Sequence, residues 1–389
     1  MIIPLSLIKK HWFAALEAVE FGTMHFTGPD GSIKTFSGKQ PGPEAHFAIQ
    51  EWDVLRRLVA RGDIALGEDY IAGRWESKNI ESLISFFLLN LSRFDNFAHG
   101  NVFNRIGFSI FNRVLRRNSK RGSKSNIKAH YDVGNDFYKL WLDDSMTYSS
   151  ALYQTGADDL RTAQAAKYGR ILNRIANTGG SVLEIGCGWG GFAEEAANQN
   201  HQVTALTVSK AQHDFSTKRL DGRADIRLQD YRDSSGLYDN IVSIEMFEAV
   251  GERFWPSFFN TVNQRLKRGG KAVVQTITIA DEYFADYRQR SDFIRHYVFP
   301  GGMLPSVGRF KEVAAKAGMA CTDVFSFGQD YARTLREWGE RFEAQKHNII
   351  AMGHSESFIR TWRFYLAMCA AAFAVGRTDV VQIEMAHAS

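Results

Sequence analysis

The stretch SVLEIGCGWGGFAEEAA, Ser181–Ala197, places four glycines between an apolar run and an Ala/Glu-rich run. An apolar strand followed by Gly186, Gly188, Gly190 and Gly191, and then by a helix, exposes a bare backbone that a ligand can approach closely. A strand, glycine loop and helix of this kind can hold either a dinucleotide or S-adenosylmethionine. The loop therefore predicts a nucleotide-containing cofactor without deciding between these two.

Two features favour S-adenosylmethionine. The G-x-G-x-G-G spacing has no later glycine placed for a pyrophosphate at a helix N-terminus, and LQDY ends an expected strand with Asp230 available to an adenine amino group. The strand HQVTALTV lacks the terminal acidic residue that grips ribose hydroxyls, so polar side chains such as Ser209 must replace it. The predicted cofactor set is Gly186, Gly188, Thr207, Val208, Gln212, Asp230 and Tyr231, with Tyr148 and Ser149 closing over the methionine end.

Strands and helices must alternate to position these residues. Apolar, β-rich runs recur between helical stretches from SVLEIG onward, as HQVTALTV, ADIRLQD, YDNIVSIEM and KAVVQTITI. This alternation predicts parallel pairing and an α/β fold with a doubly wound, Rossmann-like sheet. Residues 1–115 mix short β-like and helical pieces and predict a smaller α+β domain. A basic linker over 116–128 and a second domain over 129–389 complete the expected organisation.

Five motifs follow one another along the chain: HYDVGNDFYKLWLDDSMTYSSALY, EIGCGWGG, VSIEMFEAVG, FIRHYVFPGGMLPS and GQDYARTL. In this order they resemble the cyclopropane fatty acid synthases and the related mycolic acid methyltransferases. The resemblance covers the chain from about His130 to its C-terminus. ALGEDYIAGRWESKNIESLISFFL is similar to the extra N-terminal domain of the long bacterial synthases. The resemblance implies a class I methyltransferase fold.

The resemblance also implies an activity, which is methyl transfer from S-adenosylmethionine to the cis double bond of a phospholipid acyl chain. Proton loss then closes a cyclopropane. The first step makes a carbocation on the chain, so the site must supply proximity, dry surroundings and cation stabilisation, which aromatic faces can provide. We therefore expect an unsaturated membrane phospholipid as the substrate.

Members of this family are thought to use bound bicarbonate as the base, held by a Cys, a Glu, a His, a Tyr and a backbone amide. The resemblance places the Glu at Glu248, the Tyr at Tyr331 and the amide at Ile244. The Cys position is Ser150 and the His position is Gln275. Serine and glutamine can hydrogen-bond an anion, but neither titrates near neutral pH. Cyclopropane and a methyl- or methylene-branched chain therefore both stay open as products.

Charge and cysteine patterns limit the partners. Arg113–Lys128 holds seven Lys and Arg residues and no Asp or Glu, although the whole chain carries only +4. This cluster predicts either a solvated linker or a patch for anionic lipid headgroups, and it does not favour nucleic acid. Three widely spaced cysteines argue against a disulfide framework and a zinc site, so no metal is expected.

The apolar segments are too short to span a bilayer. We expect a cytoplasmic protein, peripherally associated with the inner face of the membrane through the basic cluster and the apolar region Ile84–Leu91. Whether the chain forms a homodimer stays open. Two other functions also stay open: a small-molecule N- or O-methyltransferase, and a lipid-binding protein with weakened catalysis.

Overall fold

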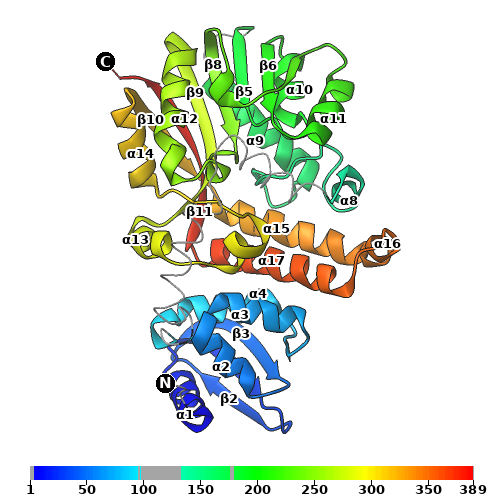
Figure 1. Ribbon diagram of the computed structural model, residues 1–389, viewed down its shortest axis with the longest axis vertical. Coiled ribbons are helices and arrows are strands. Elements are labelled where there is room, and N and C mark those ends of the chain that lie inside the picture. The colour runs from blue at the N-terminus through cyan, green and yellow to red at the C-terminus, as the bar shows by residue number, and fades with distance from the viewer. Residues whose placement is uncertain (1–3, 95–96, 98–132, 176–178, 389) are drawn as a thin grey trace. The chain divides into compact units, whose positions relative to one another are not determined.

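The computed structural model describes residues 4–94, 97, 133–175 and 179–388. The chain divides into two compact units (Figure 1). The first unit combines Met1–Leu115 with Asp286–Val298 and Glu343–Arg377, and the second combines Arg116–Ala285 with Phe299–Phe342 and Thr378–Ser389. The basic linker expected over 116–128 lies outside the described residues. The first unit is thus built from three separate stretches of the sequence.

A four-stranded sheet forms the centre of the first unit. The strands are β1 (Phe21–Thr27), β2 (Ile33–Ser37), β3 (Gln40–Ile49) and β4 (Trp75–Glu76), in the order β2-β1-β3-β4. β1 pairs parallel with β3 and antiparallel with β2. Along β1 every second residue is buried, which is the period of a sheet with one face on a core. Met24 and Phe26 lie on that buried face.

Helices complete the first unit: α1 (Leu5–Glu17), α2 (Asp53–Arg61), α3 (Asp63–Ile71), α4 (Ile80–Leu89), α16 (Lys346–Ala351) and α17 (Glu356–Ala374), with the short helices η1 (Leu91–Arg93) and η5 (Ile294–Val298). Asn79 caps α4 by accepting a 2.9 Å hydrogen bond from the Ser82 amide. In α4, Leu83, Ile84 and Phe86 are buried. Within the expected membrane-contact region Ile84–Leu91, Phe87, Leu88, Leu89 and Leu91 are only half-buried. The expected membrane contact stays a prediction, although Ile84 and Phe86 contribute to the core.

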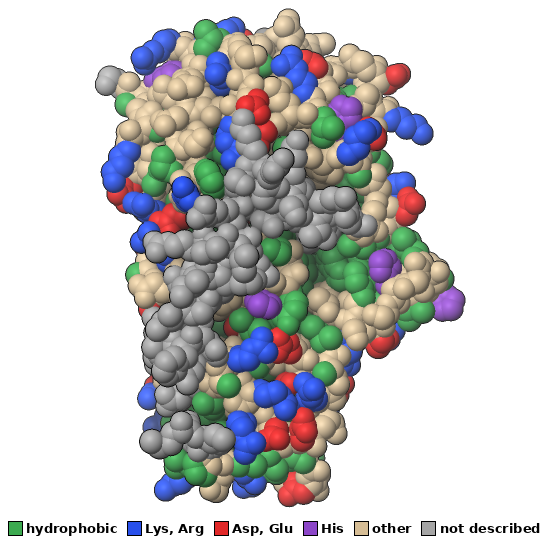
Figure 2. All heavy atoms as spheres, in the orientation of Figure 1, with side chains coloured by type: hydrophobic (Ala, Val, Ile, Leu, Met, Phe, Trp, Pro, Cys, Tyr) green, Lys and Arg blue, Asp and Glu red, His purple; other side chains and the backbone are tan. Residues whose placement is uncertain are grey.

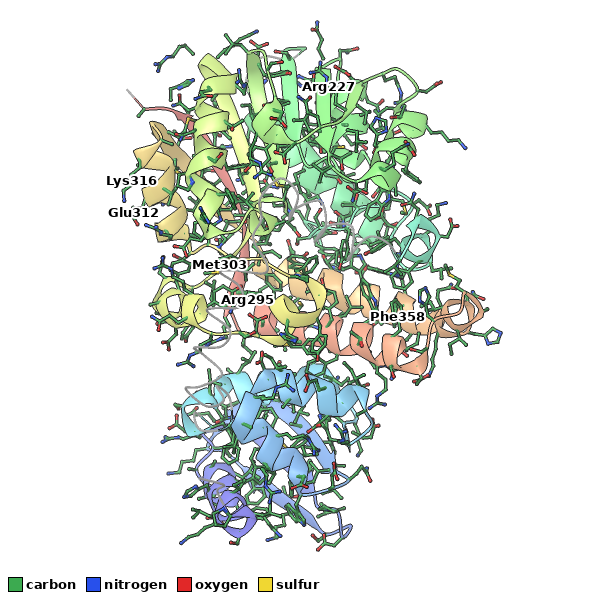
Figure 3. All side chains as sticks on the ribbon, viewed as in Figure 1. Arg227, Arg295, Met303, Glu312, Lys316 and Phe358 are labelled. Atoms are coloured by element: carbon green, nitrogen blue, oxygen red, sulfur yellow. The ribbon has the colours of Figure 1, made fainter. Side chains whose placement is uncertain are left out.

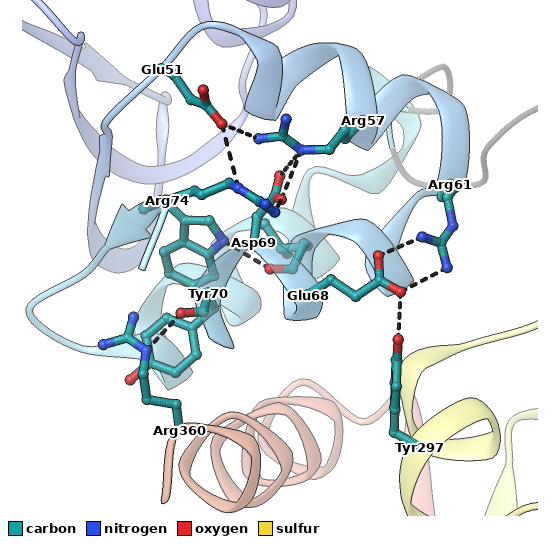
Figure 4. A network of polar contacts seen from close by, with 11 residues as sticks. Glu51, Arg57, Arg61, Glu68, Asp69, Tyr70, Arg74, Tyr297 and Arg360 are labelled. Atoms are coloured by element: carbon teal, nitrogen blue, oxygen red, sulfur yellow. Dashed lines mark hydrogen bonds and ion pairs between the residues drawn. The ribbon is translucent and has the colours of Figure 1, made fainter. Parts of the chain in front are cut away.

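A charged network lies over α2 and α3 in the first unit (Figure 4). The buried carboxylate of Asp69 accepts hydrogen bonds from Arg57 at 2.8 and 2.9 Å and from Arg74 at 2.9 Å. Glu68 similarly joins Arg61 to the Tyr297 hydroxyl. A buried carboxylate such as that of Asp69 is tolerated only when it is paired in this way. The half-buried Glu68 ties the later segment 286–298 to α3 through Tyr297.

A seven-stranded sheet forms the second unit, in the order β10-β11-β9-β8-β5-β6-β7. Its strands are β5 (Ser181–Ile185), β6 (Gln202–Thr207), β7 (Asp225–Leu228), β8 (Tyr238–Ile244), β9 (Leu266–Ile279), β10 (Met319–Ser326) and β11 (Thr378–His387). Strands β5 to β9 pair parallel and coincide with the five expected strands. β11 pairs antiparallel with both β9 and β10. The sheet is therefore mixed, and the expectation of parallel pairing holds only for five strands.

The helices of the second unit alternate with its strands. They are α8 (Asn135–Lys139), α9 (Leu160–Arg174), α10 (Gly191–Asn198), α11 (Lys210–Leu220), α12 (Trp255–Arg265), α14 (Val307–Lys316) and most of α15 (Gly328–Ala344), with η2 (Tyr231–Asp233), η3 (Phe247–Ala249) and η4 (Glu252–Phe254). α13 (Asp281–Gln289) crosses the boundary of the two units. Ser209 caps α11 by accepting from the Gln212 amide.

The order of the strands creates a switch point in this sheet. β5, β6 and β7 follow one another in one direction, whereas β8 lies on the other side of β5, as Figure 1 shows. Ligands of open α/β sheets bind at the carboxyl ends of the strands where the order reverses in this way. The segments that follow β5 and β8, the glycine loop and the EMFEAVG segment, are therefore brought together.

Lys and Arg side chains are interspersed with Asp and Glu side chains over the described part of the visible face (Figure 2). Within the described residues, no helix has both the length and the apolar character needed to cross a membrane.

Candidate active site

Three of the four glycines of the loop have different reasons to be glycine. Gly188 has a positive φ of 53°, and a Cβ atom placed there would meet nothing within 4 Å. At Gly190 and Gly191 a Cβ atom would lie 2.9 Å from Leu220 and 2.7 Å from the Tyr168 hydroxyl. Gly190 and Gly191 thus allow close packing of the chain on itself, whereas Gly188 presents bare backbone to open space, where a ligand can approach.

Polar side chains follow β6 and β7 at the same edge of the sheet. The buried Thr207 hydroxyl donates a 3.0 Å hydrogen bond to Oε1 of the buried Gln212. The carboxylate of Asp230 is held by Arg232, whose Nε and Nη2 lie 2.8 and 2.6 Å from its oxygens. Val208 follows β6, and the Tyr231 ring packs on Phe258 with centroids 5.7 Å apart. The predicted cofactor residues therefore gather at the carboxyl ends of β5, β6 and β7.

Aromatic rings form a continuous series from the glycine loop to α15. The centroid distances are 5.0 Å for Trp189–Tyr138, 5.5 Å for Tyr138–Tyr148, 5.2 Å for Tyr148–Trp338 and 6.1 Å for Trp338–Tyr331. We call these five residues the aromatic wall. Aromatic faces attract cations, so a cation held against one of these rings would be stabilised.

A glutamate that the sequence did not single out lies at the end of the aromatic wall. Oε1 of Glu245 accepts hydrogen bonds from the Ser150 amide and from Gln275 Nε2, both at 2.8 Å. Oε2 of Glu245 accepts from the Tyr331 hydroxyl at 2.7 Å. Three of the positions expected to hold an anion thus meet on one side-chain carboxylate.

The orientation of the Gln275 amide is determined by a chain of hydrogen bonds behind it. Arg170, which can only donate, gives a 2.7 Å hydrogen bond to Oε1 of Gln382. Nε2 of Gln382 then donates to Oε1 of Gln275 at 3.0 Å. Nε2 of Gln275 is therefore the end that faces Glu245, and it requires an acceptor there. Both glutamine side chains are buried.

A buried lysine accompanies Glu245. Nζ of Lys167 donates to the Ser149 hydroxyl at 2.5 Å and to Oε1 of Gln164 at 2.7 Å, and the side chain is inaccessible to solvent. Burial lowers the pKa of Lys167, and the charge of Glu245 opposes this effect. Burial likewise raises the pKa of Glu245, against the lowering effects of Lys167, Tyr331, Ser150 and Gln275. Ser149 thus contacts a buried lysine that interacts electrostatically with Glu245.

Glu248 lies one short turn further along, in η3. One carboxylate oxygen accepts from the Ile277 amide, and its backbone carbonyl accepts from the amide of Met303 (Figure 3) at 2.9 Å. The other oxygen, Oε2, is buried without a hydrogen-bond partner within the described residues. Burial, together with the charge of Glu245, raises the pKa of Glu248 to about 8. Glu248 is therefore mostly neutral at pH 7, beside a second carboxyl group.

The remaining predicted residues keep their positions but not all of their expected contacts. Ile244 ends β8, paired with Gln275 of β9. The Ser150 hydroxyl donates to the Ala151 carbonyl at 3.0 Å rather than to an anion. The Ser150 backbone amide, rather than its hydroxyl, contacts Glu245, so the expected anion-holding role of the Ser150 side chain stays a prediction.

Two residues were missed, for different reasons. Glu245 stands in the motif VSIEMFEAVG, and its place directly after a strand is a signal equal to that of Glu248. Lys167 offers no such signal, because a lysine in a helical stretch is usually exposed.

One group of side chains in the first unit has the composition of a metal site. Ligand atoms of His25, Glu44 and His46 lie within 4.8 Å of one another, the one such group found among the described residues. His25 already bonds Thr35 at 3.0 Å and Glu44 at 3.1 Å. Hydrogen bonding across the sheet therefore accounts for this cluster.

Comparison with known proteins decides the family. Residues 118–383 match the family model described as mycolic acid cyclopropane synthetase. The chain belongs to this family. It is accordingly an S-adenosylmethionine-dependent methyltransferase that acts on lipids, with the predicted class I methyltransferase fold and a small N-terminal α+β sheet.

Individual relatives agree with this assignment. The chain is 34% identical over 358 residues to tuberculostearic acid methyltransferase UfaA1 of Mycobacterium tuberculosis, covering 86% of this chain and 81% of that protein. It is also 34% identical over 349 residues to the cyclopropane-fatty-acyl-phospholipid synthase of Escherichia coli, covering 87% of each. The solved structure of mycolic acid cyclopropane synthase CmaA1, complexed with SAH and CTAB, has a TM-score of 0.62 at 30% identity, covering 67% of this chain and 97% of that one.

Proposed function

We propose that this family member transfers a methyl group from S-adenosylmethionine to the cis double bond of an unsaturated acyl chain in a membrane phospholipid, and that the product is a cyclopropane. The observation that carries the proposal is the aromatic wall, which runs from Trp189 in the glycine loop to Tyr331 beside the Glu245 carboxylate. It joins the expected cofactor site to a group that can accept a proton, with cation-stabilising faces between them.

Residues of this chain support binding of the cofactor at the switch point of the second sheet. When bound, S-adenosylmethionine supplies an electrophilic methyl group on a sulfonium. Gly188 would admit the cofactor against its backbone, and Thr207, Gln212 and Asp230 would bind its polar groups. The rings of Tyr148 and Trp338 would exclude water and stabilise positive charge on the acyl chain.

A branched product is the second candidate. The 34% identity to tuberculostearic acid methyltransferase UfaA1 equals the identity to the cyclopropane-forming relative of Escherichia coli. After methyl transfer a hydride shift can compete with ring closure, and proton loss from the chain then leaves a methylene group. The position of the base relative to the transferred methyl group decides between the two outcomes.

We further propose that the protein acts at the inner membrane surface as a peripheral protein. The basic cluster Arg113–Lys128 supports this, because anionic headgroups attract such clusters at about 1 kcal/mol per basic residue near the surface. Binding to anionic vesicles should weaken with added salt and with charge reversal in the cluster. Equal binding to neutral and anionic vesicles would exclude a role for the cluster.

The purified protein should be incubated with S-adenosylmethionine and vesicles of a phospholipid that carries one cis-monounsaturated acyl chain. We expect acyl chains heavier by one CH₂ group, with upfield cyclopropane methylene signals in the proton NMR spectrum. Vinylic or branched-methyl signals without them would establish the branched product instead. No added carbon on the lipid, with methylation of a small amine or hydroxyl compound, would overturn the proposal and favour an N- or O-methyltransferase.

A further inference from the structure

We propose that Glu245 is the general base of this enzyme and that its carboxylate takes the place of the bicarbonate ion expected from the family resemblance. The inference deepens the proposed function and rests on it. It assigns the proton acceptor to the protein itself rather than to a bound anion.

Three hydrogen-bond donors surround the carboxylate of Glu245. The Ser150 amide, Gln275 Nε2 and the Tyr331 hydroxyl all donate to its two carboxylate oxygens at 2.7–2.8 Å. Gln275 cannot reverse its amide without losing the hydrogen bond that it accepts from Gln382, whose own orientation is held by Arg170. These groups form a set of donors built for a carboxylate-shaped anion, and a side chain already supplies one.

The backbone of Glu245 adopts an unusual conformation. Its φ is +49°, a left-handed conformation that is unfavourable for a residue with a Cβ atom. Its amide donates a 2.8 Å hydrogen bond to the Gln275 carbonyl, which holds the chain in this conformation. Strained residues persist where the surrounding structure requires them, commonly at functional sites. Here the strain directs the side chain back onto the donors of β9 and α15.

Two other ionisable side chains, Lys167 and Glu248, interact with Glu245. Lys167 is fully buried, and its charge lowers the pKa of Glu245 and so favours the carboxylate, in opposition to burial, which raises that pKa. Glu248 is a second carboxyl group, which interacts electrostatically with Glu245. Its pKa is raised to about 8, so it is mostly protonated at pH 7. A bicarbonate ion would add another negative charge beside Glu245 and would find its donors already engaged. The residues present therefore do not fit bicarbonate.

The chemical step balances with Glu245 as the only proton acceptor. The methyl group leaves sulfur as the C–S bond breaks, and a new C–C bond forms to one alkene carbon, which leaves a cation on the other. Glu245 takes a proton from the transferred methyl group, and the electrons of that C–H bond close the ring. The carboxylic acid formed at Glu245 returns its proton to water after the product leaves. No further reactant is needed.

Two substitutions of Glu245 distinguish the loss of the proton acceptor from the opening of a site for a bound anion. Glu245→Gln keeps the side-chain shape and fills the donors but cannot accept the proton. Glu245→Gly relieves the positive φ and frees the donors of Ser150, Gln275 and Tyr331. Asp221→Gly is the matched control, because it makes the same kind of exchange at an exposed residue with a φ of 45°, at the end of α11.

Lipid methylation should be measured in buffer freed of carbon dioxide, with and without added bicarbonate. We expect the native protein and Asp221→Gly to be equally active and insensitive to bicarbonate. Both Glu245 variants should lose at least about 100-fold in rate, as expected for removal of a general base. Added bicarbonate should raise the methylation rate of Glu245→Gly by at least about tenfold. It should not change the rate of Glu245→Gln, because the glutamine amide blocks the site.

A titration with isotopically labelled bicarbonate, followed by NMR, gives a readout that does not depend on turnover. Glu245→Gly should bind the ion and the native protein should not. Calorimetry with S-adenosylmethionine shows that each variant is folded. Bicarbonate-dependent activity of the native protein, undiminished activity of Glu245→Gln, or no rescue and no binding in a folded Glu245→Gly would each overturn the inference. Absence of lipid methylation in the native protein would instead overturn the proposed function, while the binding titration still tests the anion site.

Discussion

The Tyr331 hydroxyl donates a 2.7 Å hydrogen bond to Oε2 of Glu245, across 86 positions of the sequence. The contact joins α15 to the end of β8, and the Tyr331 ring continues through Trp338 into the aromatic wall. One residue therefore connects the carboxylate to the aromatic wall. Changes on either side of this contact should be visible in the pH dependence of the reaction.

Tyr331→Phe removes one of three donors to Glu245 and keeps the ring. Because this hydrogen bond lowers the pKa of Glu245, its loss should raise that pKa, so that the base is protonated at higher pH. We expect the acidic limb of the pH–rate profile to move up by about one pH unit, the effect of a hydrogen bond to a charged group. Tyr297→Phe, which removes a Tyr–Glu hydrogen bond in the first unit, is the control and should leave the profile unchanged.

Lys167→Met should have a larger effect in the same direction. The Lys167 charge is the strongest influence that lowers the pKa of Glu245, and methionine preserves most of the side-chain volume. We expect the acidic limb of the pH–rate profile to move further up than in Tyr331→Phe. Lys210→Met, at an exposed ion pair with Asp214, serves as the comparison. An unshifted profile in Lys167→Met would mean that the lysine only supports Ser149 and Gln164.

Gly188→Ala should weaken cofactor binding without preventing folding. The new Cβ atom meets no protein atom, so the cost in unfolding free energy is only that of the positive φ, about 1–2 kcal/mol. Gly222→Ala carries the same strain in open space at another site and should bind S-adenosylmethionine normally. Calorimetry and urea denaturation of both variants measure the two effects. Equal affinities in Gly188→Ala and Gly222→Ala would remove Gly188 from the cofactor site.

Glu248 should make the protein less stable as the pH rises. Its pKa is about 8 in the folded protein, against the ordinary value of 4.5, so between these pH values the folded state retains a proton that the unfolded state has lost. The free energy of unfolding then falls with rising pH through this window, by at most about 1.4 kcal/mol per pH unit for one proton. In Glu248→Gln this contribution disappears. Denaturation profiles that fall equally steeply in both proteins would contradict the raised pKa.

Short-range patterns in the sequence determined the parallel strands and predicted the cofactor half of the site. The glycine loop, the five parallel strands and the strand-end residues Thr207 and Asp230 are all encoded within a few neighbouring positions, because strand period and glycine freedom are local properties. The order of strands and crossovers then brings these ends to one edge of the sheet. The sequence alone thus predicted where a cofactor would bind and which fold would bind it.

Tertiary structure decided the base half of the site. VSIEMFEAVG contains two glutamates, and only the folded chain shows that Glu245 meets Gln275 and Tyr331 whereas Glu248 meets Ile277. Local sequence patterns also could not predict three other features. These are the burial of Ile84 and Lys167, the hydrogen bond of the Ser150 hydroxyl to Ala151 and the antiparallel pairing of β11. Each depends on contacts between segments distant in the sequence, and the backbone angle that directs a side chain is settled by those contacts rather than by its neighbours along the chain.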